Sequence, residues 1–288
     1  MSLRRLFYVA NILLLLCGAV AAQEKEPQTA DEYFNRGVER AKKAQLDAAI
    51  DDYGKAILLN PSDARAYYKR GAVKAMKADF DGALADFSKA ISIDPNNSGV
   101  YYSRGLAYVR KGDNERALSD FSKAISLDPK ETAVYSSRAG LLSKKGDYAG
   151  AVADYDKVIA AKPHIAEHYT SRGLARAAMG NYDEAIEDFS KAIELRPGNA
   201  TAYHKRGNAY QKKGDADAAI ADYNEAITFV PGLAAAYADR GLAELGKGMD
   251  DAAEQDFKKA LELSADLKPM IETESNKIKQ KRKAQTQP

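Results

Sequence analysis

The sequence predicts an all-α protein, built as a solenoid of repeated helix pairs. The first observation is a strict period: six prolines, from Pro61 to Pro231, stand thirty-four residues apart with no insertion or deletion between them. The second is that each period contains two segments with apolar residues at helical spacing, separated in four periods by a Gly-Asp or Gly-Asn pair. A fixed period of this size indicates repeats that stack on their neighbours instead of enlarging one core.

The composition is that of a folded protein without a strong charge. The chain has 288 residues, of which 45% are hydrophobic and 29% are charged. Without Arg4 and Arg5, which lie in a predicted leader, 41 basic residues stand against 41 acidic ones. This balance argues against a general nucleic-acid binder. Cys17, the single cysteine, lies in the same leader, so disulfides, thiol catalysis and cysteine metal sites are excluded from the mature chain.

Residues 1–22 have the layout of a secretory signal peptide. Arg4 and Arg5 precede a mostly apolar stretch, and Ala19-Val20-Ala21 is a cleavage site of the small-x-small type. The sequence therefore predicts export, to the bacterial periplasm or out of the cell. The alternative is an uncleaved membrane anchor through residues 6–22, although this stretch is short for a span. A polar linker follows at residues 23–29.

The repeats fill most of the remaining chain. Their predicted boundaries are 30–63, 64–97, 98–131, 132–165, 166–199, 200–233 and 234–267. Position eight is glycine in six repeats and position twenty is alanine in all seven, which would let the two helix axes approach closely. Tyrosine at position four and an aromatic residue at position twenty-four would fill the space beside them. Residues 268–288 are predicted to form a capping helix with a basic tail, because a solenoid needs its last repeat covered.

The repeated pattern resembles a known family. Aromatic, Gly, Ala, aromatic, Ala and Pro stand at positions four, eight, twenty, twenty-four, twenty-seven and thirty-two, which is similar to the tetratricopeptide repeats over residues 30–267. The resemblance implies antiparallel helix pairs stacked into a right-handed superhelix. It also implies a groove lined by the first helix of each pair, which family members use to bind peptides or proteins.

Two charged positions depart from the family pattern. Position seven is arginine in every repeat (Arg36, Arg70, Arg104, Arg138, Arg172, Arg206 and Arg240), and position twenty-three is aspartate in every repeat (Asp52, Asp86, Asp120, Asp154, Asp188, Asp222 and Asp256). A charge among core positions is costly unless it is paired. We therefore expect a ladder of Arg–Asp pairs along the helix packing; the alternative is that both residues are solvated.

The groove is the predicted partner-binding site. The residues expected to line it and to contact a partner are Asn35, Arg65, Tyr68, Lys69, Tyr102, Arg110, His204, Asn208 and Gln211. Asn35 with Arg65 and Lys69 resembles half of the clamp with which some family members grip a C-terminal carboxylate. The alternative for these three residues is an ordinary polar groove surface.

The sequence offers no recognisable catalytic, metal or cofactor site. His164 to His168 spells H-x-x-E-H, but Pro163 and the repeat boundary fall at His164, so the two histidines are not expected to share a helix face. The predicted function is a non-enzymatic scaffold or adaptor of the cell envelope that binds a protein or peptide. The alternatives are a self-associating structural protein and an enzyme with an unrecognised site. Membrane contact through an uncleaved N-terminus or the basic tail, the partner's identity and the oligomeric state remain open.

Overall fold

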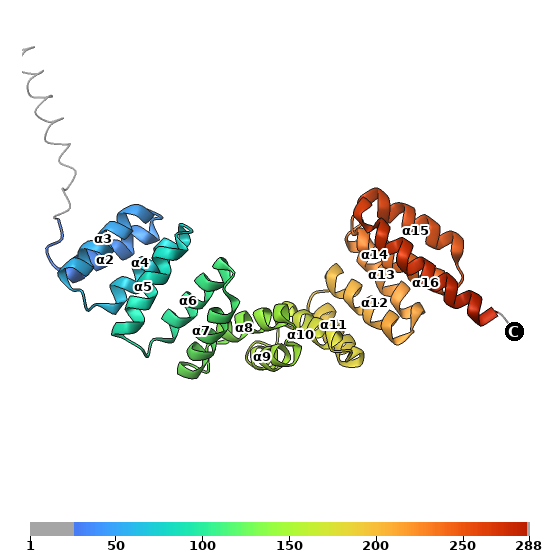
Figure 1. Cartoon of the computed structure of the whole chain (residues 1–288), viewed down its shortest axis with the longest axis horizontal. Coiled ribbons are helices and arrows are strands. Elements are labelled where there is room, and N and C mark those ends of the chain that lie inside the picture. Colours follow the sequence, from blue (N-terminus) through green and yellow to red (C-terminus); the bar gives the residue numbers. More distant parts are fainter. Residues whose placement is uncertain (1–25, 287–288) are drawn as a thin grey trace, which may run out of the picture. The chain divides into compact units, whose positions relative to one another are not determined.

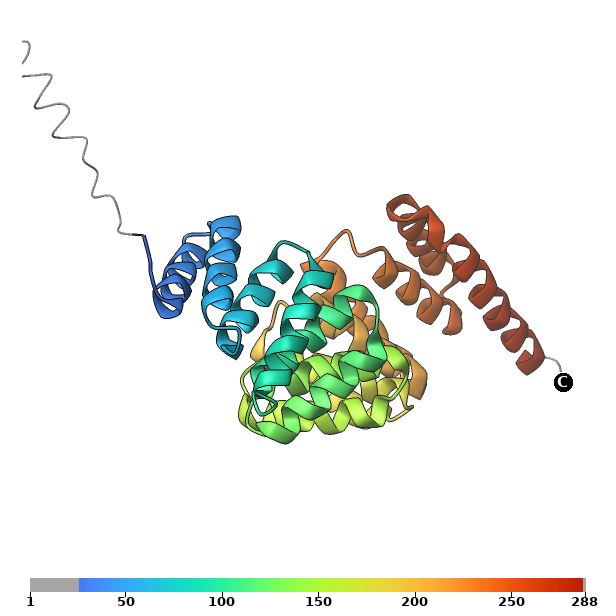
Figure 2. The same ribbon diagram turned by 60° about the vertical axis from the view of Figure 1, so that its left-hand side comes forward.

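The computed structural model describes residues 26–286, and these residues form α-helices, one short 3-10 helix and connecting turns, with no strand among them. This confirms the all-α prediction. The predicted signal peptide, residues 1–22, lies outside the described residues, as does the first part of the linker. The chain divides into two compact units, residues 1–111 and 112–288, and its helices follow one another along the chain from α2 to α16 (Figures 1 and 2).

Helices follow one another in pairs joined by short turns. Unit 1 contains α2 (Ala30–Lys42), α3 (Leu46–Leu59), α4 (Ala64–Met76), α5 (Phe80–Ile93) and α6 (Ser98–Lys111). Unit 2 contains α7 (Asn114–Leu127), α8 (Thr132–Lys145), α9 (Tyr148–Ala161), α10 (Ala166–Ala178), α11 (Tyr182–Leu195), α12 (Ala200–Lys213), α13 (Ala216–Phe229), α14 (Ala234–Gly246), α15 (Asp250–Leu263), a 3-10 turn (Ala265–Leu267) and α16 (Lys268–Thr286). Within each unit the second helix of a repeat packs both on its own first helix and on the first helix of the next repeat.

The turn between paired helices is set by a left-handed residue and a capping aspartate. Gly146 has a φ of 87°, and Asp147, the next residue, accepts a hydrogen bond from the backbone N–H of Gly150 at the start of α9. Glycine adopts this backbone conformation without strain, and the aspartate satisfies an N–H that the helix leaves unpaired. In unit 1 the same place is taken by Ala44 and Ala78, with φ of 56° and 63°.

The small residues at positions eight and twenty allow the close helix approach that the sequence predicts. All seven alanines at position twenty are at most 1% exposed: Ala49, Ala83, Ala117, Ala151, Ala185, Ala219 and Ala253. A Cβ atom on Gly207 would lie 2.7 Å from Cε1 of Tyr223, closer than such atoms pack. Glycine at position eight therefore makes room for the aromatic ring at position twenty-four.

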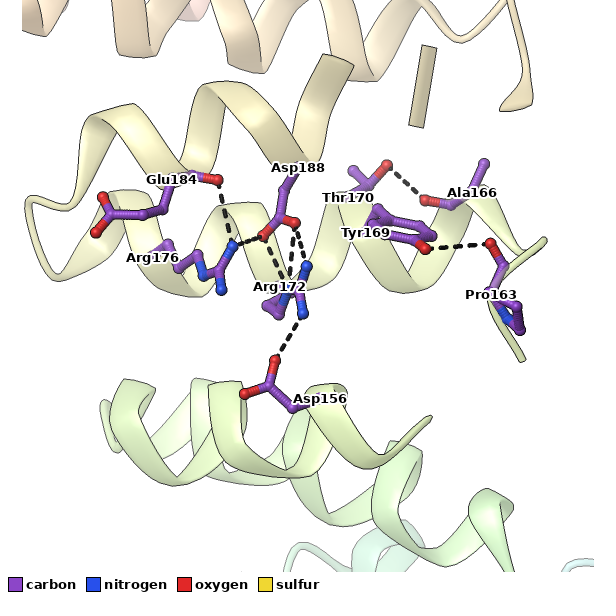
Figure 3. A network of polar contacts seen from close by, with 9 residues as sticks. All are labelled: Asp156, Pro163, Ala166, Tyr169, Thr170, Arg172, Arg176, Glu184 and Asp188. Atoms are coloured by element: carbon purple, nitrogen blue, oxygen red, sulfur yellow. Dashed lines mark hydrogen bonds and ion pairs between the residues drawn. The ribbon is translucent and has the colours of Figure 1, made fainter. Parts of the chain in front are cut away.

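Arginine and aspartate form the expected pairs inside the stack (Figure 3). In repeat five, Nε of Arg172 donates to Oδ2 of Asp188 at 3.0 Å and Nη2 donates to Oδ1 at 2.5 Å. Two-point pairs of this kind join Arg36–Asp52, Arg70–Asp86, Arg138–Asp154, Arg172–Asp188, Arg206–Asp222 and Arg240–Asp256. The aspartates of these pairs are all buried, so for these six repeats the ladder is confirmed and the solvated alternative is wrong.

Each of several arginines also reaches the repeat before its own. Nη1 of Arg172 donates to Asp156 at 2.6 Å (Figure 3), and Nη1 of Arg138 donates to Oγ of Ser122 at 3.0 Å. The hydrogen bonds to Asp154 hold the pKa of Arg138 above its usual value. Because one guanidinium joins two neighbouring repeats, the ladder stabilises the stack as well as the individual helix pair.

The C-terminal helix packs on the first helix of the last repeat. α16 lies along α14 (Figures 1 and 2), and Ile271 of α16 is buried in one cluster with Ala238 and Ala260. Near its other end, Nη1 of Arg282 donates to the carbonyl oxygen of Leu245 at 3.2 Å, and the same guanidinium pairs with Asp250. The residues of α14 that face α16, such as Ala238, are therefore shielded from solvent.

None of the helices in residues 26–286 combines the length and the apolar character needed to cross a membrane.

Candidate functional site

The candidate site is the face of the first helices that the stack leaves uncovered. Leu106 of α6 and Leu174 of α10 both stand at position nine of their repeats, and they are 39% and 40% exposed. Neither leucine is needed to fill the core between paired helices, because the position-twenty-four aromatic rings do that. Exposed apolar side chains on one face of several first helices are typical of a binding surface.

In unit 1 this face contains an apolar pocket between α4, α5 and α6. Its volume is about 290 Å³. Phe80 and Phe87 of α5 and Leu106 of α6 line it, together with the exposed Met76. Arg110, one turn after Leu106, stands at its border.

In unit 2 an equivalent pocket lies between α10, α11 and α12, with a volume of about 220 Å³. Its apolar lining includes Leu174, Tyr182 and Phe189, which stand at positions nine, seventeen and twenty-four of repeat five. Lys205 and Lys212 of α12 form the opposite wall. The two pockets therefore use corresponding repeat positions in different units.

A tyrosine at position twenty-four adds a polar group beneath the face where the two pockets have a phenylalanine. The hydroxyl of Tyr223 donates to Oε1 of Gln211 at 2.7 Å, so this buried position carries a polar group that Phe87 and Phe189 lack. Tyr155 also has polar neighbours, because Ser171 and Ser143 of the flanking first helices lower its pKa against the effect of burial. Burial raises the pKa of both Tyr155 and Tyr223.

In unit 1 one of the predicted groove residues, Arg65, is held by contacts within the chain. The guanidinium of Arg65 pairs with Asp63 and with Asp31, with Nη2 at 2.8 Å from a carboxylate oxygen of each, and it stacks 4.9 Å from the ring centre of Phe34. The hydrogen bonds that the guanidinium donates to Asp63 raise the pKa of Arg65. An arginine with two carboxylates already bound is poorly suited to the half clamp that the sequence indicates.

The other predicted residues of unit 1 lie on the same helices. Asn35 is exposed on α2, and Lys69 lies 5.5 Å from the ring centre of Tyr68. The hydroxyl of Tyr68 accepts a hydrogen bond from Oγ of Ser103 at 3.3 Å, which joins α4 to α6. Tyr102 is half-buried on α6, and Arg110 is exposed at the pocket border. Of the predicted residues of unit 1, Arg110 is the one that lines the apolar pocket, and in unit 2 Asn208 lines the pocket above Phe189.

In unit 2 two of the predicted residues of α12, His204 and Asn208, bind an aspartate of the next repeat, and the third, Gln211, is joined to Asn208 through Tyr223. Nε2 of His204, a buried side chain, lies 2.7 Å from Oδ2 of Asp239. The amide nitrogen of Asn208 donates to the same oxygen at 3.2 Å and to the hydroxyl of Tyr223 at 2.8 Å, and that hydroxyl donates to Gln211. These residues therefore contribute to packing between repeats six and seven.

Sequence reasoning missed Asp239, the partner of His204. Asp239 stands at position six, where an acidic residue facing His204 could have indicated the contact. The prediction that the aromatic residues at position twenty-four are core is confirmed for Phe87 and Phe189, which are 1% and 0% exposed beneath the pockets.

The structure offers no metal centre in the part of the chain it describes. Within residues 26–286 no group of three or more His, Cys, Asp or Glu side chains could hold an ion. His168 lies in α10, and burial lowers its pKa, whereas His164 lies in the turn before that helix. The H-x-x-E-H spelling thus does not place both histidines on one helix.

Comparison with protein families finds the repeat along most of the chain. Models described as TPR repeat match residues 37–77, 79–112 and 173–214. Models described as tetratricopeptide repeat match residues 99–131, 132–165, 200–229 and 234–267. A search of curated proteins found no match.

Several solved structures share the fold. YrrB, described as a TPR protein with an unusual peptide-binding site, is 26% identical over 64% of this chain and 95% of its own, with a TM-score of 0.61. A tetratricopeptide repeat protein from Parabacteroides merdae is 22% identical over 88% of this chain and 99% of its own, with a TM-score of 0.60. MamA from Desulfovibrio magneticus is 23% identical over 59% of this chain and 96% of its own, with a TM-score of 0.56.

Proposed function

The chain belongs to the tetratricopeptide repeat family, and we propose that it is a non-enzymatic scaffold of the cell envelope that binds a protein or peptide on the exposed face of its first helices. The observation that carries the proposal is that different positions of the repeat form the stack and the exposed surface. Buried Arg–Asp pairs, alanines and aromatic rings make the stack, while the exposed positions of the first helices differ from repeat to repeat. Surface that the stack does not use is available for a partner.

The chemistry of that face supports a protein ligand. Leu106 and Leu174 offer exposed apolar surface, and Arg110, Lys205 and Lys212 offer cations beside it. Interfaces between proteins combine apolar contacts with charges at their border. YrrB, a relative by fold, is described as having a peptide-binding site, which favours the same use here.

Export to the cell envelope is the second part of the proposal. It is supported by the N-terminal sequence, in which two arginines precede an apolar stretch and a small-residue cleavage site. The mass of the chain recovered from the periplasm or the medium tests it. A product beginning near Gln23 is expected, and a full-length product in the cytoplasm would contradict it.

Partner binding is tested by cross-linking in cells. A photoreactive amino acid at Leu174, which is 40% exposed on α10, is expected to give an adduct with a defined partner. The matched control is the same amino acid at Glu187, an exposed residue on the second helix of that repeat. Adducts at neither Leu174 nor Leu106, or equal adducts at Glu187, would contradict binding on the first-helix face.

A further inference from the structure

The pockets over Phe87 and Phe189 have one construction. A phenylalanine at position twenty-four forms part of each lining, and a cation at position thirteen of the following repeat, Arg110 or Lys212, stands at the border. The two sites belong to different units and to repeats that differ at most other exposed positions. Their shared features therefore describe what each site is suited to bind.

The size of the pockets fits a single side chain. Their volumes, about 290 and 220 Å³, lie below the roughly 300–1,000 Å³ of sites that enclose small molecules. Phe189 has no hydroxyl corresponding to that of Tyr223. The Tyr223 hydroxyl accepts a hydrogen bond from Asn208 and donates one to Gln211. Position twenty-four therefore contributes only apolar atoms to the pocket where it is phenylalanine, and a hydrogen-bonded hydroxyl where it is tyrosine.

The charges at the pockets have one sign. Lys205 and Lys212 lie seven residues apart on α12, which is two helical turns or about 10 Å, and neither makes an ion pair with any residue from 26 to 286. Arg110 likewise makes no ion pair with any residue from 26 to 286. No aspartate or glutamate belongs to the described lining of either pocket. A ligand that brings carboxylates would find cations without partners.

Repeat seven shows how this face of the chain holds an occupant. There α16 packs on α14, and Leu242, at the same position as Leu174, is 6% exposed. The signs of the charges are opposite to those at the pockets. Here the repeat contributes an acidic residue, Asp250 at position seventeen, and the covering helix α16 contributes a basic one, Arg282. The chain's own example thus combines an apolar contact with a charge pair beside it, with an acidic host and a basic occupant.

We propose that each pocket binds one large apolar side chain of a protein partner, and that acidic residues flanking this side chain pair with Arg110 in unit 1 and with Lys205 and Lys212 in unit 2. The inference rests on the proposed function and specifies the chemistry of its partner. The partner segment is acidic and apolar, the charge-reversed counterpart of α16. Its binding weakens as salt screens the charges.

The test starts from a display library of random twelve-residue peptides, panned on the full chain at low salt. Selected peptides are expected to carry Leu, Ile, Met or Phe flanked by Asp or Glu. Phe87→Tyr with Phe189→Tyr, which installs the tyrosine that repeats one, four and six already accept, is expected to weaken a selected peptide about tenfold. Arg110→Gln in unit 1, and Lys205→Gln with Lys212→Gln in unit 2, are each expected to cost about fivefold at low salt and much less at high salt.

Matched controls lie next to the tested cations. Lys111 and Lys213 adjoin Arg110 and Lys212 in sequence but pair with Asp81 and Asp183 of the preceding repeats, outside the pockets. Lys111→Gln and Lys213→Gln are expected to leave the peptide affinity within about twofold, because they remove the same charge away from the site. Thermal unfolding of every variant separates lost binding from lost fold.

The outcomes separate this inference from the proposed function. Selected peptides that are basic or lack an apolar residue, or that keep their affinity in both tyrosine and glutamine variants, would overturn the pocket chemistry and leave a binding scaffold in place. A library that yields no peptide above an unrelated helical protein would overturn both. Peptides with the expected composition that lose affinity in the pocket variants, and not in the two control variants, would support both.

Discussion

Repeats five and seven place leucine at the same position and expose it differently. Leu174 in repeat five is 40% exposed and lines an open pocket, whereas Leu242 in repeat seven is 6% exposed. We attribute the difference to α16, which packs on α14 over the corresponding face. The comparison teaches that one surface of the repeat serves either as a binding face or as core, according to whether another segment covers it.

The same two repeats differ in the charge beside the buried aspartate. In repeat five, Arg176 adds a second cation, with Nη1 2.9 Å from Oδ2 of Asp188 (Figure 3). In repeat seven the corresponding residue is Glu244, which is buried beside Asp256. The aspartate therefore has two cationic partners in the open repeat, and one cationic and one acidic neighbour in the covered repeat.

The largest expected effect comes from neutralising these aspartates. Asp188→Asn should lower the free energy of unfolding by about 3–5 kcal/mol, because Arg172 and Arg176 lose the buried carboxylate that they share, and only Arg172 keeps another, the more exposed Asp156. Asp256→Asn should cost clearly less. Only one arginine, Arg240, loses this carboxylate, and the negative charge that lies beside Glu244 is removed. Urea unfolding at pH 7, followed by circular dichroism, measures both.

Repeat four supplies the intermediate control for this comparison. There Leu142 stands at the position of Arg176 and Glu244, so Arg138 is the cation that pairs with Asp154. Asp154→Asn should fall between the other two variants. Equal costs for all three would mean that the neighbouring charge has no influence on the pair.

Truncating the two leucines tests the role of α16. Leu242→Ala should cost about 2–4 kcal/mol, because it removes buried side-chain atoms and leaves a cavity, whereas Leu174→Ala should change stability by roughly 0.5 kcal/mol or less. The measurement is again urea unfolding of the full chain. A similar cost at both positions would show that α16 does not bury this face in solution.

The turns extend the comparison to the first two repeats. Repeats five and seven have Gly180 and Gly248 at the left-handed position, whereas unit 1 has Ala44 and Ala78 there. Ala78→Gly should stabilise the chain by about 0.5–1 kcal/mol, because the side chain strains this conformation. Ala85→Gly, at an exposed position inside α5, should instead destabilise by about 1 kcal/mol. Thermal melts of the two variants are expected to shift in opposite directions.

The last expected effect depends on pH. Burial, and then Asp256, raise the pKa of Glu244 above its usual value, so the folded chain binds this proton more tightly than the unfolded chain does. Its contribution to stability is present below the unfolded pKa, near 4.5, and is lost as pH rises through the folded pKa. Glu244→Gln should therefore stabilise by roughly 1 kcal/mol at pH 7 and by little at pH 4.

The control for the pH effect is Glu187→Gln, on the exposed face of α11. This substitution also removes one negative charge, and it should leave the pH dependence of the unfolding midpoint unchanged. A Glu244→Gln variant whose stability follows pH as the parent does would contradict the assignment.

The stack itself follows from the sequence alone. Its determinants are local or separated by a fixed number of residues: Gly146 and Asp147 end one helix and begin the next, and Arg138 pairs with Asp154 sixteen residues away. A strict period repeats each such contact in the same geometry, so one interpretation applies to every copy. For the same reason the pattern predicted the close approach at Gly207.

Exposure and availability were decided only by the tertiary structure. Arg65 is held by Asp31 and Asp63, and His204 is buried against Asp239, so residues predicted to contact a partner are bound within the chain. Leu174 and Leu242 are indistinguishable by repeat position, and Leu242 is the one on the helix against which α16 packs. A repeat pattern specifies which face a side chain occupies; what covers that face depends on a segment outside the pattern and on contacts between neighbouring repeats.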